Sequence, residues 1–187
     1  MKIQQIDPSN YEINKTVIMT YESDFYYDLN LESNENGWKI NLELKELQET
    51  YIKNWKEPLF STHKKHCEFF FVFDEAKDPS SHNESIEIGY LTIGQDVWNK
   101  TLRIWDLYID NDYKRKGIGT KLIKKAIQKS REYGCRALVL ETQSSNYPAI
   151  QFYKKCGFGL IGFDVIAYSN IDIEKKEVRL ELGLKLD

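Results

Sequence analysis

Cysteine, proline and methionine are scarce in this chain of 187 residues, which contains three, four and two of them. The cysteines are widely spaced, form no Cys-x-x-Cys pair and have no histidine at a zinc-site spacing, so we expect free thiols and no bound metal. No apolar run approaches ~18 residues, and charged residues are spread through the N-terminal region. These absences argue against a disulfide scaffold, a secretory leader and a transmembrane helix, and they favour a cytoplasmic protein without membrane contact.

A strong excess of one charge is also absent, since the formal net charge is -3. The two signs are nevertheless separated: residues 1–60 carry eleven acidic residues against six lysines, whereas residues 111–136 carry nine basic residues against two acidic ones. The basic stretch is typical of an anion site or of a solvated helix face, and the acidic stretch suits a cationic partner. With 41% hydrophobic and 29% charged residues, the chain is predicted to fold as one domain over residues 1–187.

Secondary-structure signals are clearest in the second half of the chain. Apolar residues recur on one face of a helix that begins near Ile118, lysines occupy the other face, and Gly134 ends it. The strands expected at 102–109 and 137–140 flank this helix, which gives a βαβ unit. The other expected elements are strands at 2–6, 68–73, 86–93, 160–168 and 178–186, and a helix between Asn146 and Gly157.

The N-terminal third gives weaker signals. Pro8 and the two polar residues after it suggest a helix start. Residues 21–31 are crowded with aromatic and acidic side chains and show no clean period, so we interpret them as a functional loop. A helix is expected near residues 43–56.

The segment Tyr-Lys-Arg-Lys-Gly-Ile-Gly-Thr at residues 113–120 carries the main chemical signal, because it lies between a strand and a helix. A helix N-terminus leaves four N–H groups unpaired and is a ready anion site, and glycines let a phosphate approach the backbone. A nucleoside-triphosphate loop needs Gly-Lys-Ser/Thr at the helix start, and a dinucleotide fingerprint needs a third glycine where Leu122 stands. The segment therefore predicts a diphosphate site that suits neither ATP nor NAD.

This segment resembles the acetyl-CoA motif of the GNAT acyltransferases, Gln/Arg-x-x-Gly-x-Gly/Ala, with Lys114 at the first position and Gly117 and Gly119 at the glycine positions. A second block, from Asn146 to Phe158, resembles the family signature Asn-x-x-Ala-x-x-Phe-Tyr-x-x-x-Gly-Phe. The two blocks match independently and in the right order. Within the family the chain looks most like streptothricin acetyltransferases, through residues 140–143 and an element around Trp38.

The resemblance implies a GNAT fold of the α/β (α+β) class. Its central sheet is mixed, mostly antiparallel and six- to seven-stranded, splayed between strands 4 and 5 and flanked by about four helices. Residues 68–168 form the acetyl-CoA-binding core, residues 1–66 a variable substrate-side portion, and residues 176–186 a C-terminal strand. The residues implied to bind acetyl-CoA are Leu107, Tyr108, Ile109, Lys114, Arg115, Lys116, Gly117, Ile118, Gly119, Thr120, Asn146 and Tyr153.

The activity implied is transfer of an acetyl group from acetyl-CoA to a primary amine by direct attack in a ternary complex. A free alkyl amine has a pKa of ~10, so a base or a water chain must remove a proton before attack. The resemblance makes Tyr153 the general acid toward the leaving thiolate, and Asp106 is the first candidate base. Glu141 is the second.

The acceptor is expected to be small and cationic, either streptothricin-like or polyamine-like, because carboxylates and ring faces attract cations. The expected acceptor residues are Tyr26, Asp28, Trp38, Trp105 and Glu141. A protein or peptide N-acetyltransferase and a non-catalytic acyl-CoA-binding module remain alternatives, and the protein is either a monomer or a homodimer. A nucleic-acid partner is not expected, because a cofactor helix accounts for the lysines of the basic stretch.

Overall fold

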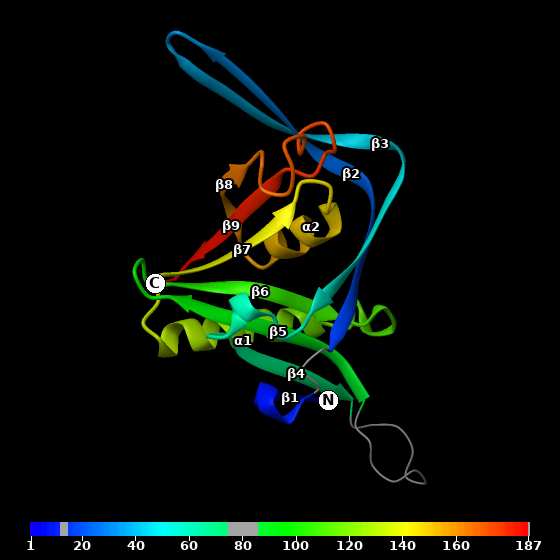
Figure 1. Cartoon of the computed structure of the whole chain (residues 1–187), viewed down its shortest axis with the longest axis vertical. Coiled ribbons are helices and arrows are strands. Elements are labelled where there is room, and N and C mark those ends of the chain that lie inside the picture. The colour runs from blue at the N-terminus through cyan, green and yellow to red at the C-terminus, as the bar shows by residue number, and fades with distance from the viewer. Residues whose placement is uncertain (12–14, 75–85, 187) are drawn as a thin grey trace. The chain divides into compact units, whose positions relative to one another are not determined.

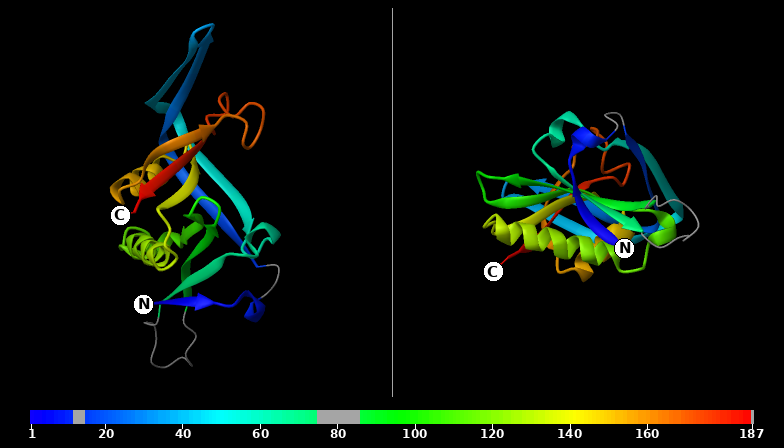
Figure 2. Two further views of the ribbon diagram at one scale, coloured as in Figure 1. Left: turned by 90° about the vertical axis from the view of Figure 1, so that its left-hand side faces the viewer. Right: turned by 90° about the horizontal axis from the view of Figure 1, so that it is seen from below.

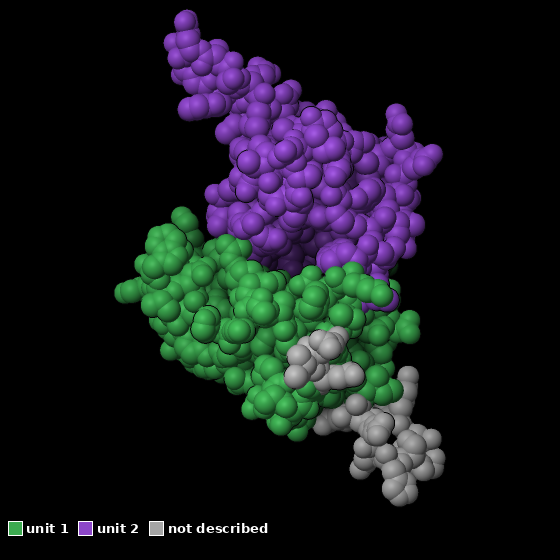
Figure 3. Space-filling model, viewed as in Figure 1, with its two compact units in different colours: residues 1–17, 56–139, 185–187 green, residues 18–55, 140–184 purple. Residues whose placement is uncertain are grey.

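The computed structural model describes residues 1–11, 15–74 and 86–186, so residues 75–85, which follow the strand expected at 68–73, lie outside the described residues. The chain divides into two compact units, which Figure 3 distinguishes by colour. The first unit comprises residues 1–17, 56–139 and 185–187, and the second comprises residues 18–55 and 140–184. In the described ranges, no helix combines the length and apolar character needed to cross a membrane.

Seven strands follow one another in a single hydrogen-bonded order, β1-β4-β5-β6-β7-β9-β8 (Figure 1). The pairs β1–β4, β4–β5, β5–β6 and β8–β9 are antiparallel. The connection from β6 to β7 passes through a helix. The strands are β1 (Lys2–Ile6), β4 (Glu68–Asp74), β5 (Ile86–Asp96), β6 (Thr101–Ile109), β7 (Ala137–Gln143), β8 (Gly159–Asp164) and β9 (Arg179–Lys185).

The first unit is built on β4, β5 and β6 with the helix α1 (Ile118–Glu132). Residues 69–72 of β4 are all buried, which marks a strand covered on both faces. The buried residues of α1 include Leu122, Ile123 and Ala126, so its apolar face is the one that the sequence predicted, and Gly134 follows the helix with φ +62°. The described residues of this unit also form short 3-10 turns at Pro8–Asn10, Thr62–Lys64 and Asn111–Tyr113.

The pairing of β5 with β6 contains a β-bulge. Thr92 of β5 is paired with Asp106, but the next residue, Ile93, is paired with Ile104, so Trp105 is an extra residue on β6. Such a β-bulge turns the strand and changes the direction of neighbouring side chains.

The second unit contains a long hairpin of β2 (Thr16–Asn34) and β3 (Gly37–Pro58), together with the helix α2 (Tyr147–Lys155) (Figure 1, Figure 2). Two expectations were wrong here: residues 21–31 lie in a strand rather than a loop, and residues 43–56 form a strand rather than a helix. Pairing between β2 and β3 overrides the helix preference of the Glu, Lys, Leu and Gln residues of β3, because strand formation depends on cross-strand neighbours.

The helix expected from Pro8 is a single 3-10 turn, and the described residues contain two α-helices where about four were expected. The core of the second unit is a cluster of Leu29, Ile150, Val178 and Leu180, with Leu42 and Phe163 among the side chains that pack on it. The hairpin, α2 and the C-terminal strands therefore share one core.

Gly89 of β5 lies opposite Ile109 of β6, and a Cβ atom at Gly89 would stand 2.6 Å from the carbonyl oxygen of Tyr108. We predict that Gly89→Ala lowers the free energy of unfolding by ~1–3 kcal/mol, because the added methyl group forces the two strands apart. Urea unfolding followed by circular dichroism measures this loss. Gly159→Ala in β8 is the matched control, since a Cβ there meets nothing within 4 Å; equal losses in the two variants would contradict the prediction.

Candidate functional site

The predicted diphosphate turn lies in the first unit, between the 3-10 turn at Asn111–Tyr113 and α1. The amide of Lys114 donates to the carbonyl of Asn111, and Arg115 then takes a left-handed conformation with φ +62°. Gly117 is the N-cap of α1 with φ +77°, a conformation that favours glycine. A Cβ atom added at Gly117 would meet nothing within 4 Å, so the space in front of the helix is open.

Some backbone N–H groups at the start of α1 have no hydrogen-bond acceptor within the described residues. The first intrahelical bond of α1 runs from the amide of Lys121 to the carbonyl of Gly117, at 3.2 Å. The amides of Ile118, Gly119 and Thr120 precede it, and within the described part of the chain they have no hydrogen-bond partner. No acidic residue lies in the first turn of α1. The turn therefore suits an anion, because its amides are free, the space in front of them is open and the positive end of the helix dipole faces that space.

The strand before the turn supplies the other predicted cofactor contacts in this unit. Leu107, Tyr108 and Ile109 of β6 are only partly buried, whereas Asp106 is buried. The Tyr108 ring lies 5.4 Å from the ring of Tyr90, its partner on β5. One edge of β6 is thus fixed to β5 before the chain enters the diphosphate turn.

Asp106, the first candidate base, lies in a buried ion pair. Lys64 Nζ lies 2.8 Å from Asp106 Oδ1 and 2.8 Å from Glu57 Oε1, and the Lys64 side chain is 2% exposed. Burial raises the pKa of the Asp106 carboxyl, and the Lys64 ammonium opposes that rise. Burial works to lower the pKa of Lys64, but Asp106 and Glu57 outweigh it and the pKa is raised. No sequence pattern predicted these contacts, because Lys64 is far from β6 in the chain and lies in no apolar pattern.

Trp105 stands on the bulge of β6 and is partly exposed. Its ring lies 5.4 Å from the ring of His63 and 5.8 Å from the guanidinium of Arg103. The ring therefore already has a cation of the chain beside it.

In the second unit, α2 positions the two predicted cofactor-binding residues of the second motif, Asn146 and Tyr153. Asn146 is the N-cap, and its side-chain oxygen accepts a 3.3 Å hydrogen bond from the amide of Ala149. Asparagine is one of the residue types that favour this position. Tyr153 is buried, with its ring 5.2 Å from Phe152 and 5.7 Å from Phe158.

Glu141, the second candidate base, lies on β7 and is exposed. Its Oε2 lies 2.8 Å from Nε of Arg179, and the hydroxyl of Tyr168 lies 3.5 Å from its other carboxylate oxygen. Burial raises the pKa of Tyr168, and the charge of Glu141 adds to that rise. Glu141 is therefore held by one cation and one phenol.

Three of the predicted acceptor residues, Tyr26, Asp28 and Trp38, lie on the hairpin. Within the described residues, no hydrogen bond, ion pair or ring contact links them to one another. Tyr26 is buried with Lys176 Nζ 4.8 Å from its ring centre, and Asp28 forms an ion pair with Lys45. Trp38 is 82% exposed. Trp38 is therefore open to solvent, whereas Tyr26 is buried.

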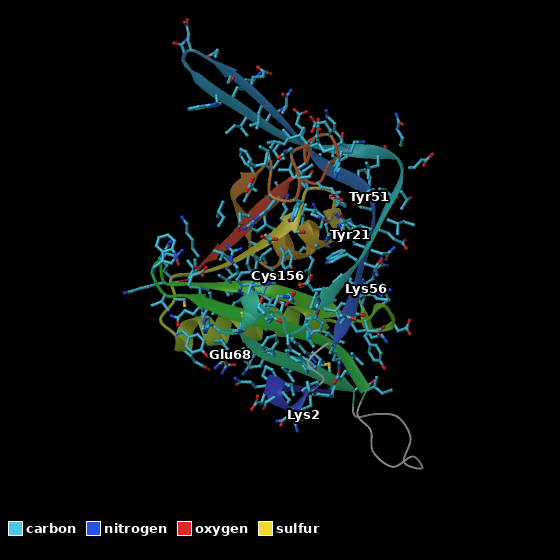
Figure 4. The ribbon with its side chains drawn as sticks, in the orientation of Figure 1. Lys2, Tyr21, Tyr51, Lys56, Glu68 and Cys156 are labelled. Carbon is cyan, nitrogen blue, oxygen red and sulfur yellow. The ribbon has the colours of Figure 1, made fainter. Side chains whose placement is uncertain are left out.

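The hairpin instead forms an aromatic cluster that the sequence reasoning missed. Tyr21 donates to Gln143 Oε1 at 2.9 Å, and the rings of Tyr51 and Trp55 lie 6.1 and 6.3 Å from its ring. Figure 4 labels both tyrosines. The hydroxyl of Tyr51 donates to Glu177, which also pairs with Lys53. The period-two spacing of Tyr51, Lys53 and Trp55 was the available signal, since it places all three on one face of a strand.

A model of the acetyltransferase (GNAT) family matches residues 26–158 of this chain. The chain belongs to the GNAT family. Streptothricin acetyltransferase A of Bacillus subtilis (strain 168) is 41% identical to this GNAT chain over 73 residues, which are 39% of the chain and 42% of that protein. The chain thus spans less than half the length of this curated relative.

Two solved structures are similar to this GNAT chain over its whole length. A nourseothricin acetyltransferase has a TM-score of 0.76 at 19% identity, covering 100% of this chain and 98% of that one. A Bacillus anthracis protein provisionally assigned as a streptothricin acetyltransferase, solved with acetyl coenzyme A, has a TM-score of 0.66 at 22% identity, covering 100% and 97%. The predicted family, its streptothricin-type resemblance and the α/β fold are confirmed.

The splay predicted between strands 4 and 5 stays a prediction. So do the roles of the individual site residues. In the described ranges, no group of three or more His, Cys, Asp or Glu side chains is arranged to hold a metal ion.

We predict that Lys64→Met lowers the free energy of unfolding at pH 7 by ~3–5 kcal/mol, because it leaves the Asp106 carboxylate buried without its cation. Without Lys64 the pKa of Asp106 rises further above its unfolded value of about 3.9, so the folded state binds a proton more tightly and the loss shrinks as the pH falls toward 4. Denaturant unfolding between pH 4 and 8 measures this trend.

The double variant Lys64→Met, Asp106→Asn is the control, since it removes both charges. It should recover part of the stability at pH 7. A loss that is independent of pH, or a double variant as unstable as Lys64→Met, would argue that Lys64 serves only as packing.

Proposed function

We propose that this chain is an acetyl-CoA-dependent N-acetyltransferase that acts on a primary amine of a small cationic molecule. The observation that carries the proposal is the turn before α1, where the amides of Ile118, Gly119 and Thr120 lack partners within the described residues. A coenzyme A diphosphate is an anion of the kind that such a turn binds. Membership of the GNAT family and the acetyl-CoA complex of the Bacillus anthracis protein support this choice of ligand.

Residues of the first unit hold the cosubstrate in this proposal. The amides of the turn bind the diphosphate, and Lys114, Arg115 and Lys116 add positive charge around it. The main chain of Leu107, Tyr108 and Ile109 hydrogen-bonds the pantetheine arm. An N–H group near Leu107 or Tyr108 polarises the thioester carbonyl as a small oxyanion hole does.

The reaction needs two proton movements. The neutral amine attacks the thioester carbonyl carbon, the carbon–sulfur bond breaks, and the amide nitrogen loses a proton while the thiolate gains one. Tyr153 supplies the proton to the thiolate. Asp106 and Glu141 each already pair with a cation, Lys64 and Arg179, so a water chain that ends on one of them is the route that disturbs these pairs least.

The acceptor amine needs a carboxylate and ring faces, because both attract an alkylammonium group. The cluster of Tyr51, Trp55 and Glu177 in the second unit has both, and an ammonium group of the acceptor would share the Glu177 carboxylate with Lys53. We assign the acceptor's cationic part to this cluster. The similarity to a streptothricin acetyltransferase supports a substrate with several amines, and a polyamine has the same chemistry.

We predict that Gly117→Val weakens acetyl-CoA binding at least tenfold, since a side chain at φ +77° strains the turn and enters the open approach to its amides. Isothermal titration calorimetry with acetyl-CoA measures the affinity. Gly134→Val is the matched control, because Gly134 also has positive φ and open space but lies at the other end of α1. Equal weakening by both substitutions would mean that the loss reflects helix stability and not the turn.

An amine panel tests the activity itself. The chain is mixed with acetyl-CoA and streptothricin, spermidine or a lysine peptide, and free thiol release is followed over time. We predict turnover of streptothricin or spermidine above that of the peptide. Preference for the peptide would favour a protein acetyltransferase, and tight acetyl-CoA binding with no turnover of any amine would favour a non-catalytic module.

A further inference from the structure

One face of the sheet in the first unit carries a group of buried oxygens without partners. Oη of Tyr90, Oγ1 of Thr92 and Oδ2 of Asp106 make no hydrogen bond within the described residues. The residues that carry them are 4%, 0% and 7% exposed. Native proteins pair nearly all buried polar atoms with protein groups or with ordered water, because an unpaired one destabilises the fold. These oxygens therefore need a partner that the described part of the chain does not supply.

The three oxygens belong to neighbouring positions of β5 and β6. Thr92 is paired directly with Asp106, beside the β-bulge. Directly opposed side chains of an antiparallel pair share one face, with their Cβ atoms ~5 Å apart. Tyr90 lies two residues before Thr92 on β5 and therefore points to the same face. The three side chains thus gather at one place on the sheet.

The electrostatics of these side chains agree with that placement. Burial raises the pKa of Tyr90, and the charge of Asp106 adds to that rise. Burial also raises the pKa of Asp106, and the Thr92 hydroxyl is among the groups that oppose this rise. Thr92 Oγ1 is thus close to the carboxylate, yet it does not meet the geometry of a hydrogen bond.

A single water molecule satisfies this arrangement. The carboxylate oxygen of Asp106 accepts hydrogen bonds, whereas the hydroxyls of Tyr90 and Thr92 each donate or accept. A water that donates to Asp106 and Thr92 and accepts from Tyr90 pairs all three oxygens. Buried waters typically make about three hydrogen bonds to groups that are otherwise unpaired.

Lys64 covers the same carboxylate and pairs with a second one. Its Nζ lies 2.8 Å from Oδ1 of Asp106 and 2.8 Å from Oε1 of Glu57, so Oδ2 is the oxygen of Asp106 that is left over. When Asp106 takes up a proton, Lys64 keeps Glu57 as its counter-ion, and no buried charge is left alone. Asp106 therefore changes its charge at a lower cost than the sole partner of a buried cation does.

Two further titratable side chains face this ion pair. Burial raises the pKa of the Cys67 thiol to about 11, and it raises the pKa of the Tyr90 phenol as well. Both groups are therefore neutral near pH 7. Among the three residues around the unpaired oxygens, only Asp106 is a carboxylate that accepts a proton.

We propose that Tyr90, Thr92 and Asp106 hold a buried water molecule, and that this water is the inner end of the chain that takes a proton from the acceptor amine. The proposal rests on the proposed function and selects Asp106 over Glu141 as the final proton acceptor. Asp106 directly precedes Leu107, one of the two residues proposed to polarise the thioester carbonyl. Tyr90 and Thr92 are positioning residues here, since they act through the water.

The proton transfer balances within this group. An N–H bond of the substrate ammonium breaks and its proton passes to water, while the buried water gives one of its own protons to Oδ2 of Asp106. The amine becomes neutral, Asp106 becomes protonated and the water is regenerated. Before the next turnover the proton returns to solvent by the same route.

A high-resolution crystal structure of the full chain tests the water site directly. We expect an ordered water within hydrogen-bond distance of Tyr90 Oη, Thr92 Oγ1 and Asp106 Oδ2. A structure without a water there, or one in which Tyr90 bonds directly to Asp106 and leaves no place for a water, would overturn the proposal.

The sign of a stability change gives a second test that needs no activity. Tyr90→Phe should lower the urea midpoint of unfolding, because it removes a hydrogen bond to the water. Ser130→Ala is the matched control, since Ser130 Oγ is also buried without a partner but lies on α1. Its midpoint should not fall. A midpoint that rises in Tyr90→Phe would mean that the hydroxyl is unpaired and the site is empty.

Kinetics test the role of the water. Tyr90→Phe and Thr92→Val should each lower kcat at pH 7 at least tenfold, with the affinity for acetyl-CoA unchanged. The loss should shrink toward pH 10, where solvent deprotonates an amine with a pKa of ~10. Ser130→Ala should keep the wild-type kcat. An unchanged kcat in Tyr90→Phe, or a loss that is equal at every pH, would exclude the relay.

Failure of this inference is distinguishable from failure of the proposed function. A wild-type chain that turns over no amine would remove the proposed function and the relay with it, whereas the crystal structure and the unfolding midpoints still decide the water site. Turnover without a water at Asp106 would keep the function and remove the inference.

Discussion

The first turn of α1 leaves backbone N–H groups that the helix cannot pair, and the sequence does not pair them elsewhere in the described residues. Unpaired donors are costly when buried and useful when they face an anion, so the turn is kept open by a glycine with positive φ. β6 brings the chain to this turn, and α1 carries it away into the core. The proposed chemistry depends on this arrangement, because a thioester must be held before an amine can attack it.

Burial of charge is the second constraint on the first unit. Lys64 and Asp106 form a buried ion pair beside the bulge of β6, and the partly exposed Glu57 is the second carboxylate on Lys64. Removing one member of such a group is costly, because the remaining charge is left in a poorly solvating environment. The ion pair therefore fixes the position of β6 relative to the turn at Thr62–Lys64, and any proton that Asp106 takes up changes the balance of this pair.

Local patterns in the sequence predicted the second half of the chain well. α1 has a helical period and a terminal glycine, and Asn146 caps α2 as its residue type suggests. The hairpin was missed because β3 contains strong helix formers and becomes a strand only through its pairing with β2. The period-two spacing of Tyr51, Lys53 and Trp55 was the local signal for this strand, but the helix formers between and around these residues outweighed it in the prediction.

The sequence predicted the part of the site that depends on neighbouring residues and missed the part that depends on distant ones. The diphosphate turn depends on adjacent residues, so the sequence located it. Lys64 and Glu177 contact partners 42 and 126 residues away, and neither stands in a motif. Most lysines are exposed, so the sequence alone predicts a surface position for a lysine whose buried partners are not yet known.

An amide-resolved NMR titration with coenzyme A shows whether the turn before α1 binds the diphosphate. We expect the amide signals of Ile118, Gly119 and Thr120 to shift strongly on addition of coenzyme A, and we expect pantetheine, which lacks the diphosphate, to leave them in place. Signals that stay unchanged while coenzyme A perturbs other parts of the chain would contradict this assignment.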